Sequence, residues 1–339
     1  MKLFTITVGD LQAGSTKFRI VDYLPFLQKN QIEVKIVSQH ELDKSHLKEI
    51  EKADLVINQK CLLDGRWRKK ILKACPKVIF DFDDAIYTRP GKPFSWLTRL
   101  RVQHRFKNWL ASSKHVITSS DFLKVQAIKY QPQTTVIPMA LDMTAWKPAE
   151  KSPKQFTIGW AGAPGNLHHL ERLDIVLCKV LDRHPEAKLV IFSGKRPQLS
   201  CRYEYVPYAP GEEVKFIQRL NVGLLPLSNE EFSRGKSPIK AIQYLACGIP
   251  VVGNVYGATT DILNPQNSLA VNTTEEWVNA LESLIQQPNL QEQLGKAGRK
   301  HAELLFDHRI TSTHLLDIIR SVYKSETSGN LETIKGSLR

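Results

Sequence analysis

The stretch that decides the fold is residues 234–252, which read R-G-K-S-P-I-K-A-I-Q-Y-L-A-C-G-I-P-V-V. Ser237 and Pro238 are placed to begin a short helix, as its cap and its first helical residue. Gly248 ends that helix, and a β-branched strand follows at once. A helix that leads directly into a strand is half of a β-α-β unit, so this stretch predicts a parallel sheet.

Short apolar runs separated by helical patterns recur on both sides of this stretch. Each run has the length and β-branched content of a buried strand, and the alternation with helices is typical of α/β folds. Two sets of runs predict two Rossmann-like domains, each a doubly wound parallel sheet, joined by a proline-containing linker at 138–153. The expected strands are residues 3–8, 33–37, 55–58, 78–81, 115–118 and 135–137, then 156–160, 188–192, 222–226, 250–252 and 269–271.

Beyond residue 271 the pattern is wholly helical. One helix is expected to open near Thr274, which is its candidate cap, and two more follow at about 290–306 and 308–323. No internal repeat is evident.

Composition and charge exclude several classes of protein. The 339 residues include 47 Lys and Arg against 34 Asp and Glu, a net charge of +13, and their 42% hydrophobic content excludes a disordered chain. Five widely spaced cysteines without a C-x-x-C pair predict neither a disulfide framework nor a zinc site, and they suit a reducing cytosol. Residues 1–9 are not expected to act as a signal peptide, and no run reaches the ~18–20 apolar residues of a spanning helix.

Ligands in open parallel sheets bind at the carboxyl ends of the strands, so the first-domain loops that follow strands are candidate sites. Residues 9–19 include Gly14 and Arg19 and offer backbone N–H groups and charge to an anion, but they lack the P-loop order of an NTPase. An ordinary strand-to-helix turn is the alternative interpretation. Residues 81–84 crowd three carboxylates, which must be solvated, paired with Arg89 and Lys92, or used in a polar site. A metal is not expected there, because no second acidic or histidine set completes a shell.

The second domain has two further loops with unusual chemistry. Residues 159–165 carry three glycines, Gly162 among them, but the spacing is G-x-x-G-x-x-G, so a nicotinamide dehydrogenase is not expected. The histidine pair that follows at 168–169 is assigned no role. Lys236 precedes the helix of the opening stretch and Lys240 lies in its first turn, where the helix dipole disfavours cations. Two lysines at that end predict a bound anion such as a diphosphate.

With these segments in view, the chain resembles the GT-B glycosyltransferases, most closely family 4, the "group 1" glycosyltransferases. The resemblance is strongest at the donor-binding segment, whose pattern in this family is E-x7-E followed by A-M-A-x-G-x-P-V-V. Further matching segments follow one another in the family's order through nearly the whole chain. The matching segments are residues 14–25, 81–86, 136–148, 222–227, 243–252 and 257–263.

This resemblance implies a GT-B fold with two domains that face one another across a cleft. The expected divisions are an acceptor-side domain at 1–147, a nucleotide-sugar-binding domain at 148–310, a helix at 311–326 that braces the two, and a frayed tail at 327–339. The implied enzyme is a glycosyltransferase for cell-surface glycan or glycoconjugate synthesis. It moves a sugar from a nucleotide-diphosphate sugar to a glycan or lipid-linked acceptor, with retention and without a metal or other cofactor.

The resemblance also implies roles for individual side chains. Lys236 and Lys240 are expected to neutralise the departing diphosphate, and Asp83 to lie near the reacting sugar. The substrate-binding residues implied are Gln243 at the donor ribose, Gly162 and Thr259 along the donor pocket, and Gly14 and Arg19 across the cleft.

Two positions depart from the family pattern. Gly235 and Gln243 stand where the family has two glutamates, and the basic residues that many members carry near 159–165 are not evident. A non-catalytic relative that binds nucleotide sugars or polyanions is therefore the alternative function.

The excess charge belongs mainly to the first 150 residues, with 25 basic against 15 acidic side chains. Residues 66–77 and 92–114 each carry six basic side chains and no acid. Because aromatic residues and leucines accompany the second run, we expect a helix that lies on an anionic membrane surface; solvated helix faces are the alternative. Nucleic acid is not an expected partner, because no reader motif accompanies the charge. The expected location is cytoplasmic, peripheral on the inner face of the membrane.

Overall fold

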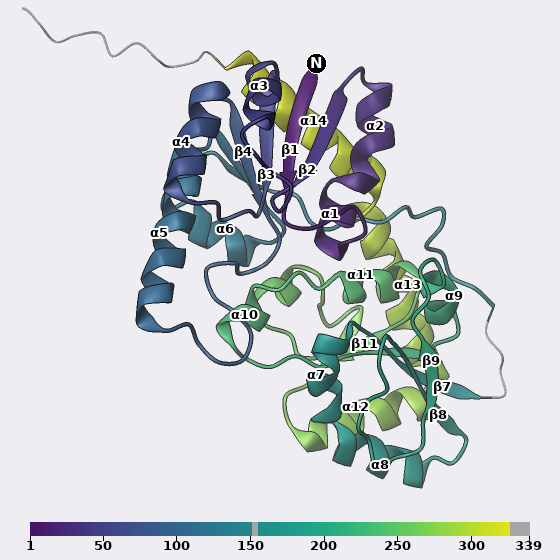
Figure 1. The fold of residues 1–339 in the computed structure, drawn as a ribbon. Coiled ribbons are helices and arrows are strands. Elements are labelled where there is room, and N and C mark those ends of the chain that lie inside the picture. The colour runs from purple at the N-terminus through teal and green to yellow at the C-terminus, as the bar shows by residue number, and fades with distance from the viewer. Residues whose placement is uncertain (151–154, 326–339) are drawn as a thin grey trace, which may run out of the picture.

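The computed structural model describes residues 1–150 and 155–325, which form two α/β domains with a parallel sheet in each. Figure 1 shows the first domain in purple and blue and the second in teal and green. The tail predicted at 327–339 and residues 151–154 of the predicted linker lie outside the described residues. The first domain contains β1 (Lys2–Thr7), α1 (Gly14–Arg19), η1 (Val21–Tyr23), α2 (Leu24–Lys29), β2 (Glu33–Ser38), α3 (His46–Glu51), β3 (Leu55–Gln59), α4 (Gly65–Ala74), β4 (Val78–Phe82), α5 (Trp96–Ser112), β5 (His115–Thr118), α6 (Asp121–Ala127) and β6 (Thr134–Val136).

The second domain has the same alternation of strands and helices. Long helices are the last elements of the described part of the chain. Its elements are β7 (Phe156–Ala161), η2 (Pro164–Asn166), α7 (Leu167–Glu171), α8 (Asp174–Arg183), β8 (Ala187–Ser193), β9 (Glu204–Pro207), α9 (Glu213–Gln218), β10 (Val222–Leu225), α10 (Glu231–Arg234), α11 (Ile239–Ala246), β11 (Val251–Gly253), η3 (Gly257–Asp261), β12 (Ser268–Ala270), α12 (Thr274–Gln286), α13 (Pro288–Leu305) and α14 (His308–Lys324).

Both sheets are wound in two directions from a central strand. The strand order is β2-β1-β3-β4-β5-β6 in the first sheet and β12-β11-β10-β7-β8-β9 in the second, and every pairing is parallel. The direction of winding therefore changes between β1 and β3, and between β7 and β10. In doubly wound sheets such a switch point leaves a crevice at the carboxyl ends of the strands.

Each sheet is covered by helices on both faces because its strands are apolar on both sides. In β1, Leu3 faces the core formed with α2 and α14, whereas Phe4 and Ile6 face the core formed with α3, α4 and α5. This alternation follows from the two-residue period of a strand. The second sheet is sandwiched in the same way, between α7, α8 and α12 on one face and α9, α11 and α13 on the other.

The final helix, α14, leaves the second domain and packs on the first. Its residues Leu315 and Ile319 are buried against the first sheet, and Thr311 accepts a hydrogen bond from the Tyr23 hydroxyl at 3.1 Å. The crossing is fixed where residues 141 and 307 form a parallel bridge: Leu141 N donates to Phe306 O at 2.9 Å, and His308 N donates to Leu141 O at 3.0 Å. Two chain segments thus run side by side between the domains.

The fold differs locally from the expectations, and one alternative given for the carboxylates at 81–84 does not hold. The strand β9 was missed, because its four residues lie at the sheet edge and are only partly buried. Thr273, not Thr274, caps α12, in a capping box with Glu276. The carboxylates at 81–84 do not pair with Arg89, whose guanidinium donates to backbone carbonyls of its own loop.

The carboxylate of Asp81 pairs instead with Arg19, and both side chains are buried. Arg19 Nε donates to Asp81 Oδ2 at 3.1 Å, and a further nitrogen donates to the carbonyl of Ile137 at 2.5 Å. The pair therefore joins α1, the end of β4 and the start of the interdomain segment. Burial disfavours the charge on Arg19, but the Asp81 carboxylate outweighs this and raises the arginine pKa. Within the described residues, no helix is both long and apolar enough to cross a membrane.

Replacement of Asp81 by asparagine is expected to lower the free energy of unfolding by about 3–5 kcal/mol, because it leaves the Arg19 charge buried without its partner. Urea denaturation measures the change. Glu292→Gln is the matched control, because it breaks an exposed ion pair with Lys296 and should cost about 0.5 kcal/mol or less. Equal effects of the two substitutions would contradict a structural role for the buried pair.

Candidate functional site

A cavity of about 400 Å³ lies between the two domains, at the switch point of the second sheet. The second domain forms most of its wall, from the ends of β7, β8 and β10 and the start of α11. The first domain closes it with Gly14 and Phe18 of α1. Of the predicted site residues, this cavity brings together Gly14, Gly162, Lys236, Lys240 and Gln243.

The amino end of α11 faces this cavity without a side-chain cap. Pro238, rather than Ser237, occupies the cap position and makes no side-chain hydrogen bond to the helix, because proline has no side-chain acceptor; the expected Ser237 cap is therefore wrong. The backbone N–H of Ser237 is turned toward the first domain, where it donates to Asp84 Oδ1 at 3.4 Å. Uncapped N–H groups at the positive end of a helix are donors for an anion.

Lys236 lies at the start of this helix and is held by a neutral partner. Its Nζ donates to Asn166 Oδ1 at 2.7 Å, across the cavity wall from η2. Burial lowers the pKa of Lys236, and the nearby charge of Asp84 only partly opposes the shift. A partly buried ammonium paired to an amide oxygen retains most of its attraction for an incoming anion.

Lys240 lies one helical turn further on, and its pKa is shifted further than that of Lys236. Burial lowers its pKa to about 8, with Glu213 opposing and Lys17 adding to the shift. Within residues 1–150 and 155–325, Lys240 Nζ makes neither a hydrogen bond nor an ion pair. A partly buried cation that Glu213 compensates only in part, at the positive end of a helix, destabilises the fold until an anion reaches it.

Two buried polar atoms of the cavity also have no partner among the described residues. Gln243 is 3% exposed, and its Oε1 accepts no hydrogen bond. His169 is similarly buried, its Nδ1 is unpaired, and burial together with His168 and Lys236 lowers its pKa to about 3, so the ring is neutral. Buried unpaired polar atoms are costly, and a bound ligand can satisfy them. The place of His169 on the cavity wall was not predicted, because a histidine pair at the start of a helix usually lies on the surface; its position after β7 was the available signal.

Glycines shape two sides of this region. A Cβ at Gly162 would lie 2.4 Å from the Trp160 ring, so only glycine lets the loop after β7 take this path. A Cβ at Gly235 would lie 2.6 Å from the Cβ of Ala85 in the first domain. The first of the family's two glutamates thus has no room here, because the two domains touch at this position. Gly14 has open space around its Cα, on the cavity side of α1.

Three predicted residues do not line the cavity. Arg19 is committed to Asp81 in the core, as described above. Thr259 is fully buried, and its hydroxyl is used inside its own loop, where it accepts from Tyr256 N at 2.7 Å. Asp83 is 1% exposed and pairs with Lys60 at 2.9 Å. Their expected contacts with substrate stay predictions, because none of the three is among the residues that line the cavity.

Lys60 was missed in the sequence, although it follows directly after β3. Its ammonium lies between Asp83 and Asp84 and also donates to the Ser15 hydroxyl at 2.7 Å. Burial opposes its charge, but the two carboxylates outweigh this and raise the lysine pKa. The cluster adjoins the cavity region at Ser15, next to Gly14, and at Asp84, which accepts a hydrogen bond from the backbone of Ser237. It therefore fixes the first domain against the start of α11.

The arrangement can bind a doubly charged anion with an attached polar group. Lys236, Lys240 and the open helix end supply positive charge, and Gln243 supplies an acceptor for a hydroxyl on the same wall. Apolar side chains, including Phe18 and Phe192, line the remainder. A small ligand with a diphosphate and a flat or sugar-like body matches these features.

Part of the chain is similar in sequence to known glycosyltransferases. Residues 174–314 match the model of a family described as "Glycosyl transferase-like". The D-inositol 3-phosphate glycosyltransferase of Rhodococcus jostii is 26% identical over 216 residues, which are 55% of this chain. The match covers 46% of that protein, so the chain spans about half the length of this curated relative.

Solved structures establish the fold. Sucrose-phosphate synthase from Thermosynechococcus elongatus is similar with a TM-score of 0.73, and Anabaena HepE in complex with UDP-glucose with a TM-score of 0.72. Each is 15% identical, and the similarity covers 95% of this chain and 99% or 100% of theirs. The predicted α/β class, the GT-B fold and the resemblance to GT-B glycosyltransferases are confirmed.

Replacement of Lys240 by methionine is expected to stabilise the free protein by about 2 kcal/mol at pH 7. The folded-state pKa of about 8 lies below the ordinary 10.5, so the penalty for charging Lys240 is full below pH 8 and disappears as the pH rises toward 10.5. Urea denaturation at pH 7 and pH 10 should show the stabilisation only at the lower pH. Lys300→Met, at an exposed position of α13, should change stability by less than about 0.5 kcal/mol at either pH.

Proposed function

Starting from a GT-B fold whose second domain carries the match to glycosyltransferases, we propose that this protein transfers a sugar from a nucleotide-diphosphate sugar to a glycan or lipid-linked acceptor. The single observation that carries the proposal is the cavity wall that unites Lys236, Lys240, the open end of α11 and the unpaired Gln243 oxygen. The relatives named above include a protein whose structure contains UDP-glucose, which supports a nucleotide sugar as the donor.

In this mechanism the diphosphate binds at the amino end of α11. Bond cleavage places negative charge on the leaving diphosphate and positive charge on the sugar, so cations fixed at the diphosphate stabilise the transition state more than the ground state. Lys236 and Lys240 supply this charge. Binding also raises the depressed pKa of Lys240, because the anion gives the ammonium the partner that the free protein lacks.

The remaining cavity residues orient the donor. The Gln243 Oε1 accepts a hydrogen bond from a ribose hydroxyl, in place of the carboxylate that the family pattern has at this position. The loop at Gly162 lets the donor approach the backbone after β7. These assignments fit the family 4 pattern, in which the amide of Gln243 takes the place of the second glutamate.

We further propose that the reaction retains the anomeric configuration and needs no metal. The lysines and the helix end provide positive charge where a metal ion would otherwise be placed, and Asp83 and Asp84 are already paired with Lys60. The first domain contributes Gly14 and Phe18 to the cavity wall, and neither is a base for an inverting attack. The anomeric configuration of the product, read by NMR, distinguishes retention from inversion.

A lipid-linked acceptor would place the enzyme at a membrane, and α5 offers the surface for it. Trp96, Leu97 and Leu100 at the start of this helix are 70%, 56% and 56% exposed, and Arg99 and Arg101 lie among them. The membrane-facing part is shorter than the sequence suggested, because Phe106, Trp109 and Leu110 are buried in the first-domain core. We propose a cytoplasmic protein that docks on the inner face of the membrane and acts in cell-surface glycan or glycoconjugate synthesis.

The donor reaction is tested first by a thermal-shift panel of UDP-, GDP-, ADP- and CMP-sugars, in which a donor at 100 times its Kd should stabilise the fold by about 2.7 kcal/mol. With the donor so identified, Lys236→Ala and Lys240→Ala should each lower kcat at saturating donor by about 10²–10³-fold, because each removes a cation at the leaving group. Lys195→Ala, at an exposed position outside the cavity, should leave kcat unchanged. Unchanged turnover in both site variants would refute the lysine assignment. Donor binding with neither hydrolysis nor transfer would identify the non-catalytic alternative.

Co-sedimentation with liposomes tests the membrane surface. The protein should bind vesicles that contain phosphatidylglycerol at low salt, and high salt should release it. The double variant Trp96→Ser, Leu100→Ser should bind at least about tenfold more weakly, because it removes apolar area that inserts beside the headgroups. Ile175→Ser, which removes an equally exposed apolar side chain from the second domain, is the control. If the unaltered protein does not bind these vesicles, the basic runs at 66–77 and 92–114 are solvated helix faces.

A further inference from the structure

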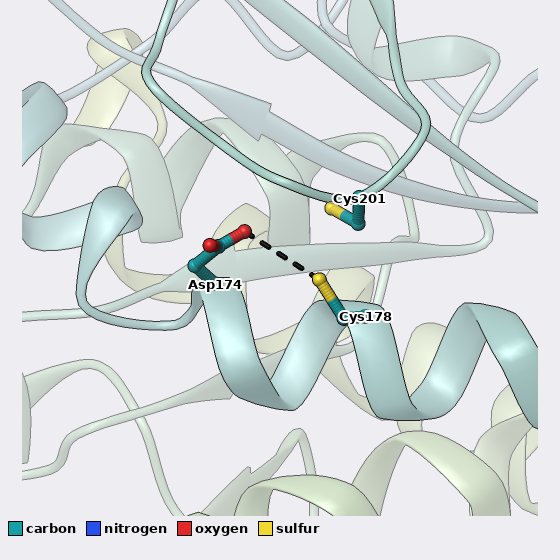
Figure 2. Close-up of side chains that lie close together, drawn as sticks. All are labelled: Asp174, Cys178 and Cys201. Atoms are coloured by element: carbon teal, nitrogen blue, oxygen red, sulfur yellow. Dashed lines mark hydrogen bonds between the residues drawn. The ribbon is translucent and has the colours of Figure 1, made fainter.

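Three side chains with metal-binding atoms meet on the second domain, away from the donor cavity. Asp174 and Cys178 lie on α8, and Cys201 lies in the loop between β8 and β9. One ligand atom from each lies within 4.8 Å of the other two, and all three residues are partly exposed. Figure 2 shows the two α8 side chains and the loop cysteine pointing toward one another. None of the three lines the donor cavity.

The local structure places these atoms for simple reasons. Asp174 is the first residue of α8, and Cys178 lies four residues later, so both side chains project from the same face of the helix. The loop is fastened to that face by the backbone N–H of Ser200, which donates to Asp174 Oδ1 at 2.7 Å. Cys201 follows immediately and is thereby held over the helix. The sequence predicted no cysteine site, because 22 intervening residues separate the two thiols and only the fold brings them together.

We infer that Asp174, Cys178 and Cys201 form a binding site for Zn²⁺ or a similar thiophilic divalent cation. In a tetrahedral zinc site with bonds of about 2.3 Å to sulfur and 2.0 Å to oxygen, a sulfur and an oxygen ligand lie about 3.5 Å apart and two sulfurs about 3.8 Å apart. The Cys178 Sγ and Asp174 Oδ1 are already 3.6 Å apart. Closing the triangle needs only a small movement of the Cys201 side chain, and water completes the fourth position.

The ligand set is negatively charged when it holds a cation, because the Asp174 carboxylate is then joined by two thiolates. Burial raises the pKa of both thiols, and the Asp174 carboxylate adds to the shift, bringing Cys201 to about 12. Each thiol is therefore protonated in the metal-free protein. When the dication binds, two S–H bonds are replaced by two metal–sulfur bonds, and two protons pass to the solvent. The hydrogen bond from Ser200 then holds the ligating carboxylate in place, as outer hydrogen bonds do in metal sites.

The cation would brace one rim of the donor cavity. The loop that carries Cys201 begins at Gly194, which lines that cavity, and the same loop is tied to α7 where Gln198 N donates to Glu171 Oε1 at 2.9 Å. A metal bond to Cys201 adds a third anchor between this loop and the helices beneath it. Its effect is to stabilise the loop rather than to take part in sugar transfer.

Titration of the chelator-treated, reduced protein with Co²⁺ under anaerobic conditions tests the site. One equivalent should give thiolate-to-cobalt charge-transfer absorption in the near ultraviolet and the visible bands of tetrahedral Co²⁺, and Zn²⁺ should abolish both. Zn²⁺ should also raise the temperature of unfolding. Cys178→Ser and Cys201→Ser should each lose most of the charge-transfer absorption, and Asp174→Asn should weaken Co²⁺ binding by about tenfold or more. Circular dichroism confirms that each variant is folded.

Two matched controls should behave as the unaltered protein. Asp182→Asn changes an exposed carboxylate two turns further along α8, and Cys75→Ser removes a thiol from the first domain. Absence of the absorption in the unaltered protein would overturn the proposal, as would its persistence in both Cys178→Ser and Cys201→Ser. A reduced protein that binds no Co²⁺, but forms a Cys178–Cys201 disulfide in air by peptide mass mapping, would instead identify a redox pair and also overturn it.

Discussion

The rest of the structure depends on the buried ion pair between Arg19 and Asp81. It holds α1 against the end of β4 and reaches the carbonyl of Ile137, where the chain leaves the first domain. Because α1 carries Gly14 and Phe18 to the cavity, the position of the first-domain wall follows from this pair. Lys60 continues the same network outward by joining Asp83 and Asp84. Charges buried in the core of one domain thus set the geometry of a site formed mainly by the other.

Several polar groups that line the cavity lower the stability of the free protein. Lys240 is partly buried with no hydrogen bond or ion pair among the described residues, and Gln243 and His169 each leave a polar atom unpaired. Such groups persist in a fold only where the surroundings force them, and they are concentrated here on one wall. Contact with the first domain also explains a departure from the family pattern, because Gly235 packs against Ala85 and leaves no room for an acid. The space for a side chain at that position is taken by the neighbouring domain.

Sequence patterns predicted the architecture well because both depend on local periodicity. All eleven expected strands are present, and β9 was missed because only four partly buried residues form it. Prediction of the site was weaker. The pattern at 234–252 predicts the helix that carries Lys240 and Gln243 and that Lys236 precedes. It does not predict the pairing of Arg19 with Asp81 or of Asp83 with Lys60, because the partners lie 62 and 23 residues apart. Long-range pairing of charges leaves no periodic signal in one sequence, and the same holds for Cys178 and Cys201.

The paired crossing at Leu141 and Asp307 has a consequence for motion. A single connecting chain would leave the domains free to rotate in any direction, but two hydrogen-bonded segments side by side resist torsion about their common axis. We expect a bend across the two paired segments to be the movement that this joint resists least, and such a bend would change the distance between the two cavity walls. The angle between the domains would then describe most of the opening and closing of the cavity.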